Sequence, residues 1–286
     1  MRRPRVVVVG DLAVDVLVAP REPAVRDADV PARIRTRAGG AGANTAAWLA
    51  HLGADVTLVA RVGDDPAGRA AAAELDACGV RPALAVDPRE PTCTVVVLLD
   101  DGERTMLSDR GAAGYLSPAD LPALDGADHL HLSGYVLLDP SSGPAGLAAL
   151  DRARAAGLTT SVDPQAAPAL TPAFRDHVRG VDLLLPNADE LAAMGGSAAA
   201  LLDTVGAVAV TDGPRGARWV DASGTWTAAA PRVDTVDPTG AGDAFDAGVL
   251  AAWLRGAEPE EALRAGCAAG AAAVATVGAR PAPASR

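Results

Sequence analysis

Residues 237–253 read D-P-T-G-A-G-D-A-F-D-A-G-V-L-A-A-W, and the fold can be worked out from this stretch. Pro238 bars a helix before it, while Gly240 and Gly242 permit a turn that bulkier residues could not make. Apolar side chains then recur with the spacing of one helix face, at Phe245, Val249 and Trp253. The pattern predicts a glycine-rich turn that runs into the first turn of a helix.

The start of this helix is suited to bind an anion such as a phosphate, because its free N–H groups lie at the positive end of the helix dipole. Asp243 lies in this first turn, where its carboxylate is expected to stay ionised at neutral pH. It either caps the helix, which contributes about 1 kcal/mol, or takes a proton from a substrate hydroxyl while the adjacent amides hold a transferred phosphoryl group. The turn alone leaves both interpretations open.

The composition limits the partners that the protein can bind. The chain has 286 residues, of which 49% are hydrophobic and only 3% aromatic, so its core must be built from Ala, Val and Leu. A net charge of -11 argues against a nucleic-acid or an anionic-membrane partner, because both require a basic surface. Any polyanion must therefore be held by a local site.

The cysteines and the apolar runs indicate a cytoplasmic protein. Three cysteines lie far apart without C-x-x-C spacing, which fits a reducing cytosol and neither a disulfide framework nor a zinc site. The apolar run after the basic start covers only residues 6–9, which is too short for a signal peptide. The alanine-rich run at 268–277 is too short to span a bilayer.

The sequence contains no lysine, because all 25 basic residues are arginine. This excludes the phosphate-binding lysine of a P-loop, the strand lysine of protein kinases and a pyridoxal Schiff base. If the protein handles phosphates, then backbone amides, a metal ion and arginine must bind them.

Strand-like and helical runs alternate along the chain, which predicts a parallel sheet with helices on both faces. No linker divides the sequence, so we expect one α/β domain over residues 1–286. Two segments, about 12–38 and 90–110, have the alternation of exposed strands, and a hairpin turn is expected at 100–103. These segments predict a small antiparallel sheet that lies off the main body as a lid.

Polar or turn residues stand at the carboxyl ends of the predicted parallel strands, which is the edge where open sheets bind ligands. They occur at residues 10–11, 63–64, 133–134, 163–164, 186–187 and 211–213. Each one alone is more often simply the start of a loop.

A second glycine-rich turn lies at residues 38–44, and its three glycines in four residues suggest backbone that approaches a ligand closely. With it, four motifs resemble the ribokinase-like (PfkB-type) family of carbohydrate kinases. They are A-G-G-A-G-A-N-T-A at 38–46 running to V-G-D-D at 62–65, N-A-D-E at 187–190, T-D-G-P-R-G at 211–216 and D-P-T-G-A-G-D-A-F at 237–245. The motifs follow the order found in the family, and the resemblance spans essentially the whole chain.

The resemblance implies a ribokinase-like doubly wound, mostly parallel sheet flanked by helices, with a small antiparallel β lid. It also implies ATP-dependent phosphorylation of a hydroxymethyl group on a sugar or sugar-like substrate. By position, Asp243 would be the base, and the amides of Gly240, Ala241 and Gly242 would form the anion hole. The positions that would hold the sugar are Asp11, Asp15, Gly39, Gly40 and Asn44.

The resemblance likewise implies ATP and Mg²⁺ as cofactors, with K⁺ as a further candidate. The matching nucleotide positions are Asn187, Glu190, Thr211, Gly213 and Gly216. In the family the N-x-x-E motif organises magnesium and phosphates, so Glu190 would act on Mg²⁺ indirectly. Asp237 and Thr239 match positions that help to bind a monovalent cation in many members.

Without lysine, arginine is the expected cationic supplement at the site. Arg104 on the lid hairpin and Arg215 in the nucleotide loop are the candidates, against the alternative that each is a solvated surface residue. The lysine that often follows the paired glycines in ribokinases is absent, since Ala41 and Gly42 stand there. This puts ribose itself in question as the substrate.

The substrate stays open between a sugar, a nucleoside and a 2-keto-3-deoxy sugar acid. A nucleoside needs an aromatic or apolar wall for its base, whereas an acid needs an arginine near the lid, such as Arg104 or Arg110. A non-catalytic sugar-binding regulator is a different class, and the presence of the base and of the N-x-x-E motif argues against it. The edges of the lid sheet favour pairing with a second copy, which makes a homodimer through the lid a candidate.

Overall fold

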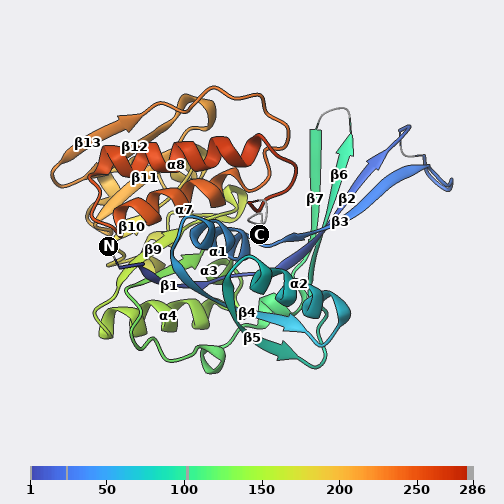
Figure 1. The fold of residues 1–286 in the computed structure, drawn as a ribbon, viewed down its shortest axis with the longest axis horizontal. Helices are drawn as coiled ribbons and strands as arrows, with labels where there is room; N and C mark the ends of the chain where they lie inside the picture. The colour runs from blue at the N-terminus through green and yellow to red at the C-terminus, as the bar shows by residue number, and fades with distance from the viewer. Residues whose placement is uncertain (1, 24, 101–102, 282–286) are drawn as a thin grey trace.

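The computed structural model describes residues 2–23, 25–100 and 103–281, and it contains two sheets of very different character (Figure 1). The predicted turn at 100–103 therefore lies in part outside the described residues. The large sheet has nine strands. From one edge to the other they are β13 (Gly224–Ala228), β12 (Ala217–Asp221), β11 (Ala207–Thr211), β10 (Leu183–Leu184), β9 (Thr159–Asp163), β8 (His129–Ser133), β1 (Arg5–Val9), β4 (Asp55–Gly63) and β5 (Val80–Asp87).

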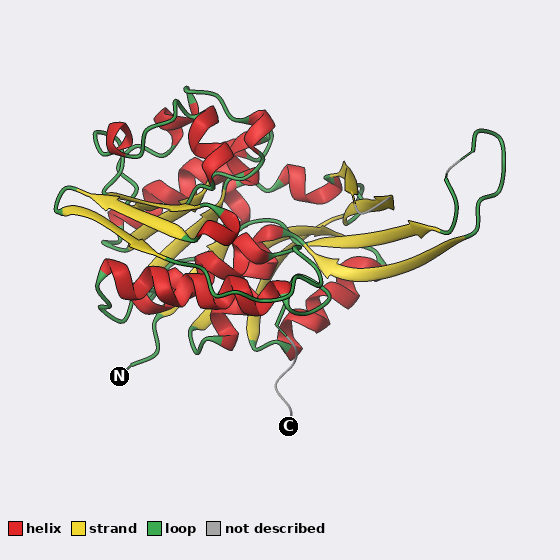
Figure 2. Ribbon diagram, turned by 90° about the horizontal axis from the view of Figure 1, so that it is seen from above, coloured by secondary structure: helices red, strands yellow, loops and turns green. Residues whose placement is uncertain are grey.

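The strands from β11 to β5 pair in parallel, and only β12 and β13 run antiparallel at one edge. Helices cover both faces of this sheet (Figure 2). The helices are α1 (Ala41–His51), α2 (Pro66–Ala77), α3 (Tyr135–Leu138), α4 (Gly143–Ala155), α5 (Phe174–His177), α6 (Ala188–Ala193), α7 (Ala241–Trp253) and α8 (Pro259–Val274). Short 3-10 helices lie at η1 (Gly111–Tyr115), η2 (Pro118–Asp120), η3 (Ala167–Ala169), η4 (Ala199–Leu201) and η5 (Gly213–Arg215).

The four valines of strand β1 show why the sheet is buried on both sides. Val6 and Val8 belong to the core that includes α1, α7 and α8, whereas Val7 and Val9 belong to the core on the opposite face, which includes α4. Alternate side chains of a strand point to opposite faces, so a run of apolar residues fills two cores at once. The expected doubly wound α/β architecture is confirmed.

The small sheet has the strand order β3 (Ala32–Gly39), β2 (Ala13–Pro20), β6 (Cys93–Asp100) and β7 (Glu103–Asp109). Two antiparallel pairs, β2 with β3 and β6 with β7, are joined by a parallel pairing of β2 with β6. The sheet projects from the main body in both views (Figures 1 and 2). Large apolar side chains on its strands are exposed, among them Ile34 at 63% and Leu107 at 56%.

Some elements were not expected from the sequence. The β12–β13 hairpin follows directly after the nucleotide loop, and its five-residue strands give little periodic signal. Helix α8 is composed mainly of small residues, and large apolar side chains are few along it. Within the described part of the chain, no helix combines the length and apolar character that crossing a membrane requires.

Candidate active site

A cavity of about 550 Å³ lies between the carboxyl edge of the large sheet and the small sheet. It brings together twelve of the positions singled out from the sequence: Asp11, Asp15, Gly40, Asn44, Asn187, Glu190, Thr211, Thr239, Gly240, Ala241, Gly242 and Asp243. The small sheet contributes an apolar wall that includes Val95, Val97 and Met106. Apart from Gly39, the predicted sugar, phosphate and magnesium positions therefore line one continuous space.

The turn before α7 requires glycine at its tightest point. Gly240 has a φ of +75°, and a Cβ added there would lie 2.6 Å from the carbonyl oxygen of Ala279. Gly240 is the N-cap residue of α7, and no side chain caps this helix. The interpretation of Asp243 as a helix cap is therefore wrong.

The buried carboxylate of Asp243 faces the second glycine-rich turn. Its Oδ2 accepts a hydrogen bond of 2.9 Å from Nδ2 of Asn44, which lies on α1. Burial raises the pKa of Asp243 to about 7, with Asp11 and Asp15 adding repulsion, although the hydrogen bonds from Asn44 and Gln165 act in the opposite direction. The expectation that this group stays ionised at neutral pH is corrected, because desolvation outweighs the hydrogen bonds that favour the charged form.

The predicted anion-binding surface consists of the N–H groups at the start of α7. Ala244 N donates the first hydrogen bond of the helix to Gly240 O at 2.9 Å. The N–H groups of the residues before Ala244 therefore have no acceptor within the helix. The N–H of Ala241 makes only a long contact of 3.4 Å with Pro238 O. A Cβ on Gly242 would meet nothing within 4 Å, so one side of this turn is open.

The predicted sugar positions surround the other end of the cavity. Gly40 has a φ of +90°, and a Cβ there would lie 2.7 Å from the carbonyl oxygen of Asp11. Gly39 does not line the cavity, but its Cα packs against Asp15, since a Cβ would lie 2.2 Å from Oδ1 of that residue. Burial and the neighbouring carboxylate of Asp11 raise the pKa of Asp15 to about 6, while Arg280 lowers it.

The N-x-x-E motif folds as a capping box at the start of α6. Asn187 Oδ1 accepts from Glu190 N at 2.9 Å, and Glu190 Oε2 accepts from Asn187 N at 2.9 Å. The Glu190 side chain is buried, which raises its pKa. A carboxylate held in this way cannot turn freely toward a ligand, which fits an indirect role at a metal.

Two buried carboxylates beside Glu190 were missed as site residues. Asp163 is the last residue of β9 and Asp246 lies on α7. Burial raises the pKa of both well above the usual value, and repulsion from Glu190 raises that of Asp163 further, although a hydrogen bond with Asp246 lowers it. Repulsion from Asp163 raises the pKa of Asp246 further. Asp246 Oδ2 is buried without a hydrogen-bond partner. The signal for Asp246 was a charged residue in an otherwise apolar helix, and Asp163 was noted only as a polar strand end.

Gln165 connects this carboxylate cluster to Asp243. Its Nε2 donates a hydrogen bond to Asp163, and its side chain also hydrogen-bonds Asp243. Gln165 and Ala166 both have positive φ values, of 60° and 44°. Such backbone is strained for residues other than glycine and is often found at functional sites.

The carboxylate oxygens at this end of the cavity fit a hard divalent cation. Mg²⁺ prefers oxygen ligands and keeps several waters while it binds substrate phosphates, and the buried Asp246 oxygen without a partner is compatible with such an ion nearby. No group of three or more His, Cys, Asp or Glu side chains among residues 2–23, 25–100 and 103–281 is arranged to hold a metal by itself.

Asp237 organises the C-terminal loop. Its Oδ1 accepts from Thr239 N at 3.0 Å, and its Oδ2 accepts from Gly278 N at 3.0 Å. The two predicted monovalent-cation positions are thus next to each other and to this loop.

A second cavity, of about 460 Å³, adjoins the first. Thr211, Pro238, Ala241 and Gly242 line both cavities. The predicted nucleotide positions Gly213 and Gly216 line the second cavity and not the first. Its other walls come from α7, α8 and the loop before α7, with Phe245, Cys267, Gly270 and Val274 among them. The nucleotide loop therefore opens toward the anion-binding turn.

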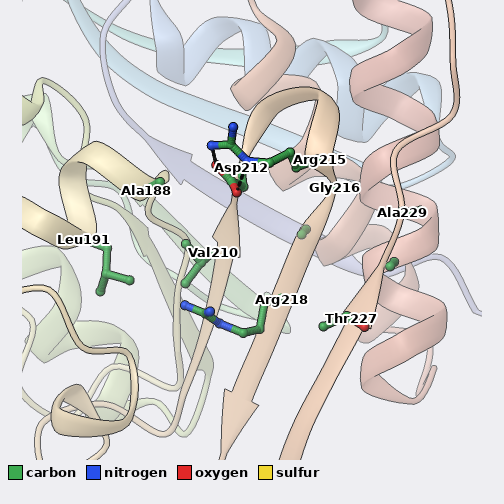
Figure 3. A pocket seen from close by; sticks show the side chains of 11 residues that line it. Ala188, Leu191, Val210, Asp212, Arg215, Gly216, Arg218, Thr227 and Ala229 are labelled. Carbon is green, nitrogen blue, oxygen red and sulfur yellow. Dashed lines mark hydrogen bonds and ion pairs between the residues drawn. The ribbon is translucent and has the colours of Figure 1, made fainter.

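The three candidate arginines have different positions. Arg215 lines a third cavity, between α6 and strands β11 to β13, where its Nε donates to Asp212 Oδ2 at 2.6 Å (Figure 3). Its side chain is 77% exposed, as the solvated interpretation expects. Arg110 lines the main cavity. Arg104 lies on β7, but its side chain is outside the described part of the structure.

The profile of pfkB family carbohydrate kinases matches residues 3–285. The chain belongs to this family. It is similar to an ATP-dependent ribose-1-phosphate kinase of Halopiger xanaduensis, with 35% identity over 90% of this chain and 88% of the relative. It is also similar to a fructokinase of Vibrio alginolyticus, with 34% identity over 77% and 78% of the two chains. An aminoimidazole riboside kinase of Salmonella typhimurium is 32% identical over 74% and 72%.

Solved structures agree with the family assignment. A putative ribokinase II of E. coli in complex with ATP and Mg²⁺ superposes with a TM-score of 0.86 and 25% identity, over 97% of this chain and 94% of the other. An adenosine kinase of Sinorhizobium meliloti, at 23% identity and a TM-score of 0.88, shares the fold. The pfkB-family chain is an ATP-dependent carbohydrate kinase.

Proposed function

We propose that the protein transfers the γ-phosphoryl group of ATP to a hydroxymethyl group of a sugar or sugar-like substrate, with Asp243 as the base. The observation that carries this proposal is the position of the Asp243 carboxylate, which lies in the first turn of α7 inside the cavity that the glycine-rich turns line. Positioning and charge neutralisation dominate phosphoryl transfer, so a weak base at the right place is sufficient.

In the proposed reaction the substrate oxygen forms a bond to the γ-phosphorus while the bond from this phosphorus to the β,γ-bridging oxygen breaks. The substrate proton passes to Asp243, and ADP leaves. The N–H groups of Gly240, Ala241 and Gly242 hold the oxygens of the migrating group. The opening beside Gly242 supports this role, because the turn offers no side chain that would keep the phosphate away.

The nucleotide lies in the second cavity in this proposal, against Thr211, Gly213 and Gly216. Its phosphates then extend past Gly242 into the first cavity, where Asn187 and Glu190 would help to hold magnesium. Mg²⁺ neutralises the charge of the phosphates when it is bound. Asp237 and Thr239 are the proposed positions for K⁺ beside the turn.

The sugar is proposed to bind between the α1 turn and the small sheet, with hydrogen bonds from its hydroxyl groups to Asp11, Asp15 and Asn44. Gly39 and Gly40 allow the backbone to come close. The apolar wall of the small sheet can cover one face of a furanose ring or of a nucleobase, so a nucleoside stays an alternative substrate.

One observation favours a second substrate class, an anionic sugar. The Nε and Nη2 atoms of Arg110 are buried without hydrogen bonds, although Nε lies 3.3 Å from Asp139 Oδ2 in an ion pair. The guanidinium lies 5.4 Å from the ring centroid of Tyr135, and both residues line the main cavity. A sugar phosphate or a keto-deoxy acid would supply the acceptors that this arginine lacks. The similarity to an ATP-dependent ribose-1-phosphate kinase supports the same class.

We also propose that two copies associate through the small sheet. The exposed apolar side chains of Ile34 and Leu107 and the open edges of β3 and β7 support such pairing.

A coupled ADP-release screen tests the main proposal. The panel contains furanoses, hexoses, a sugar 1-phosphate, keto-deoxy acids and nucleosides, each with and without K⁺. For the best substrate, Asp243→Asn is expected to lower turnover by about 10²–10⁴-fold while substrate binding, measured by calorimetry, persists. Activity on no member of the panel would favour a regulator, and near-normal turnover of Asp243→Asn would remove that residue from the base role.

A further inference from the structure

We propose that Arg280, on the loop after α8, is a positioning residue that fixes the side-chain amide of Asn44 and through it the hydrogen bond to Asp243. Arg280 Nε donates to Asn44 Oδ1 at 3.3 Å, and Asn44 Nδ2 donates to Asp243 Oδ2 at 2.9 Å. The three side chains therefore form a relay from the C-terminal loop to the carboxylate. This inference rests on the proposed role of Asp243 as the base.

The relay has only one favourable orientation. A side-chain amide has a donor end and an acceptor end, and a guanidinium can only donate. A rotation of the Asn44 amide by half a turn would place its NH₂ group against Arg280 and its oxygen against the carboxylate of Asp243. Both contacts would then be repulsive, so the guanidinium keeps the donor end of Asn44 on the base.

A second hydrogen bond holds the guanidinium in place. Arg280 Nη2 donates to Gly39 O at 2.9 Å, directly before the N-cap residue of α1. The loop that carries Arg280 is itself fixed, because Trp48 Nε1 donates to Ala279 O at 2.9 Å. Arginine suits this place because its planar fork serves two oxygens at once, which an ammonium group cannot do with the same geometry.

The charge of Arg280 also matters for the base. Besides Asn44, the charged and polar groups around Asp243 on the surrounding elements are Asp11, Asp15, Tyr135, Asp163, Gln165, Asp246 and Arg280. Five of these seven groups can only add negative charge, and Gln165 is neutral. Arg280 is the cation of this set, so its loss and the loss of an ordered Asn44 both favour the protonated form of Asp243.

The experiment measures the titration of Asp243 directly and needs no substrate. Carbon-13 NMR of the aspartate carboxyl groups is recorded against pH for the wild type and for Arg280→Met, and the Asp243→Asn spectrum assigns the signal. We expect the midpoint of Asp243 to rise by about 0.5–1 pH unit in Arg280→Met. With a substrate from the screen, kcat should fall about 10-fold, and the acid limb of kcat/KM should move to higher pH, while KM for ATP is unchanged.

Arg255→Met is the matched control. Arg255 joins the other ends of α1 and α7, since its Nη2 donates to Leu52 O and its Nη1 to Ala251 O, both at 2.7 Å. Its removal should lower the melting temperature without moving the Asp243 midpoint. Arg280→Lys keeps the positive charge but not the planar guanidinium, so we expect a titration midpoint of Asp243 and a kcat between those of the wild type and Arg280→Met. If Arg280→Met does not fold, Arg280→Lys is used for the test.

The outcomes separate this inference from the proposed function. An unmoved Asp243 midpoint in a folded Arg280→Met protein, or wild-type turnover and midpoint in Arg280→Lys, would overturn the positioning role. If Asp243→Asn keeps its turnover, the base assignment fails whatever Arg280 does. If Asp243→Asn is inactive and Arg280→Met titrates like the wild type, only the relay is lost.

Discussion

The side chains of Asn44 and Asp243 are joined by a 2.9 Å hydrogen bond although 199 positions separate them in the sequence. Each follows one of the two glycine-rich turns, and each lies in the first turns of its own helix, α1 or α7. This contact holds the proposed sugar-binding turn next to the proposed anion-binding turn. Burial raises the pKa of Asp243 at this point, and the hydrogen bond from Asn44 acts against that rise.

The first prediction concerns the pH dependence of activity. Because the pKa of Asp243 is about 7, the basic carboxylate form accumulates only as the pH rises through neutrality. We expect kcat/KM to increase tenfold per pH unit below about pH 7 and to level off above it. In Asn44→Ala the rising part of the kcat/KM profile should move to higher pH, because the hydrogen bond that stabilises the charged form of Asp243 is lost. If kcat/KM of the wild type rose only below pH 5 and was constant above it, Asp243 would not be the group that controls activity.

The second prediction concerns stability. A carboxyl group whose folded pKa is raised contributes stability that is fully present below its unfolded pKa of 3.8 and is lost as the pH rises through about 7. Asp243→Asn has no carboxyl group to titrate at this position, so it does not undergo this loss of stability. Its free energy of unfolding should therefore increase relative to that of the wild type as the pH rises. Denaturant unfolding should give a difference in unfolding free energy that is about 2–3 kcal/mol larger at pH 8 than at pH 5. A difference independent of pH would mean that the carboxyl group is not desolvated.

The third prediction separates stability from activity at Gly242. A Cβ on Gly242 would meet no atom within 4 Å, so Gly242→Ala should fold without strain. Because Gly242 lies in α7, its replacement by alanine should raise the free energy of unfolding by about 0.5–1 kcal/mol. The new methyl group would occupy the path of the phosphate, so we expect kcat to fall about 10²-fold.

Gly240→Ala is the comparison for that variant. It should lose stability, because Gly240 has a positive φ and a Cβ there would contact Ala279. Thermal unfolding and steady-state kinetics check both variants. Full activity in Gly242→Ala would remove the anion hole from this turn.

The fourth prediction concerns substrate choice. Arg110→Met should lower kcat/KM for a sugar 1-phosphate or a keto-deoxy acid by about 10–100-fold, since a charge-assisted hydrogen bond is lost. Neutral sugars should change by less than about threefold. Arg69→Met is the control, because Arg69 is 65% exposed in an ion pair with Asp64. Equal losses on neutral and anionic substrates would show that Arg110 acts on the fold and not on the charge of the substrate.

The fifth prediction concerns association through the small sheet. Ile34→Asp places a charge on an exposed apolar position of β3, so it should reduce the mass of a dimer to that of a monomer in sedimentation experiments. The unfolding midpoint of the separated chain should stay close to that of the wild type. A wild-type protein that sediments as a monomer would exclude the proposed homodimer.

The sequence was sufficient for the fold class because several signals pointed to one architecture. The valine run of β1 has no polar face, and such a strand can only lie inside a sheet covered on both sides. The turns at Gly40 and Gly240 could be located because glycine is the residue that tolerates positive φ at close backbone contacts. Local patterns of this kind do not depend on the rest of the chain.

Other features depend on contacts that no local pattern encodes. Arg280 is an ordinary arginine in the sequence, and only the course of the loop after α8 brings it to Asn44. The ionisation of Asp243 was misjudged because the helix dipole could be read from the sequence, whereas the burial of the group could not. Likewise, Asp163 and Asp246 become a coupled pair only when β9 and α7 meet.

The hairpin of β2 and β3 leaves the body through two short joints, residues 10–12 between β1 and β2 and Gly40 between β3 and α1. Asp11 and Gly40 at these joints are also proposed to hold the sugar. A ligand bound there would contact both connections at once. It would therefore restrict the motion of the whole β2–β3 hairpin, including the end that lies farthest from the pocket. Amide hydrogen exchange along β2 and β3 should accordingly slow when the pocket is filled, even at amides that the ligand never touches.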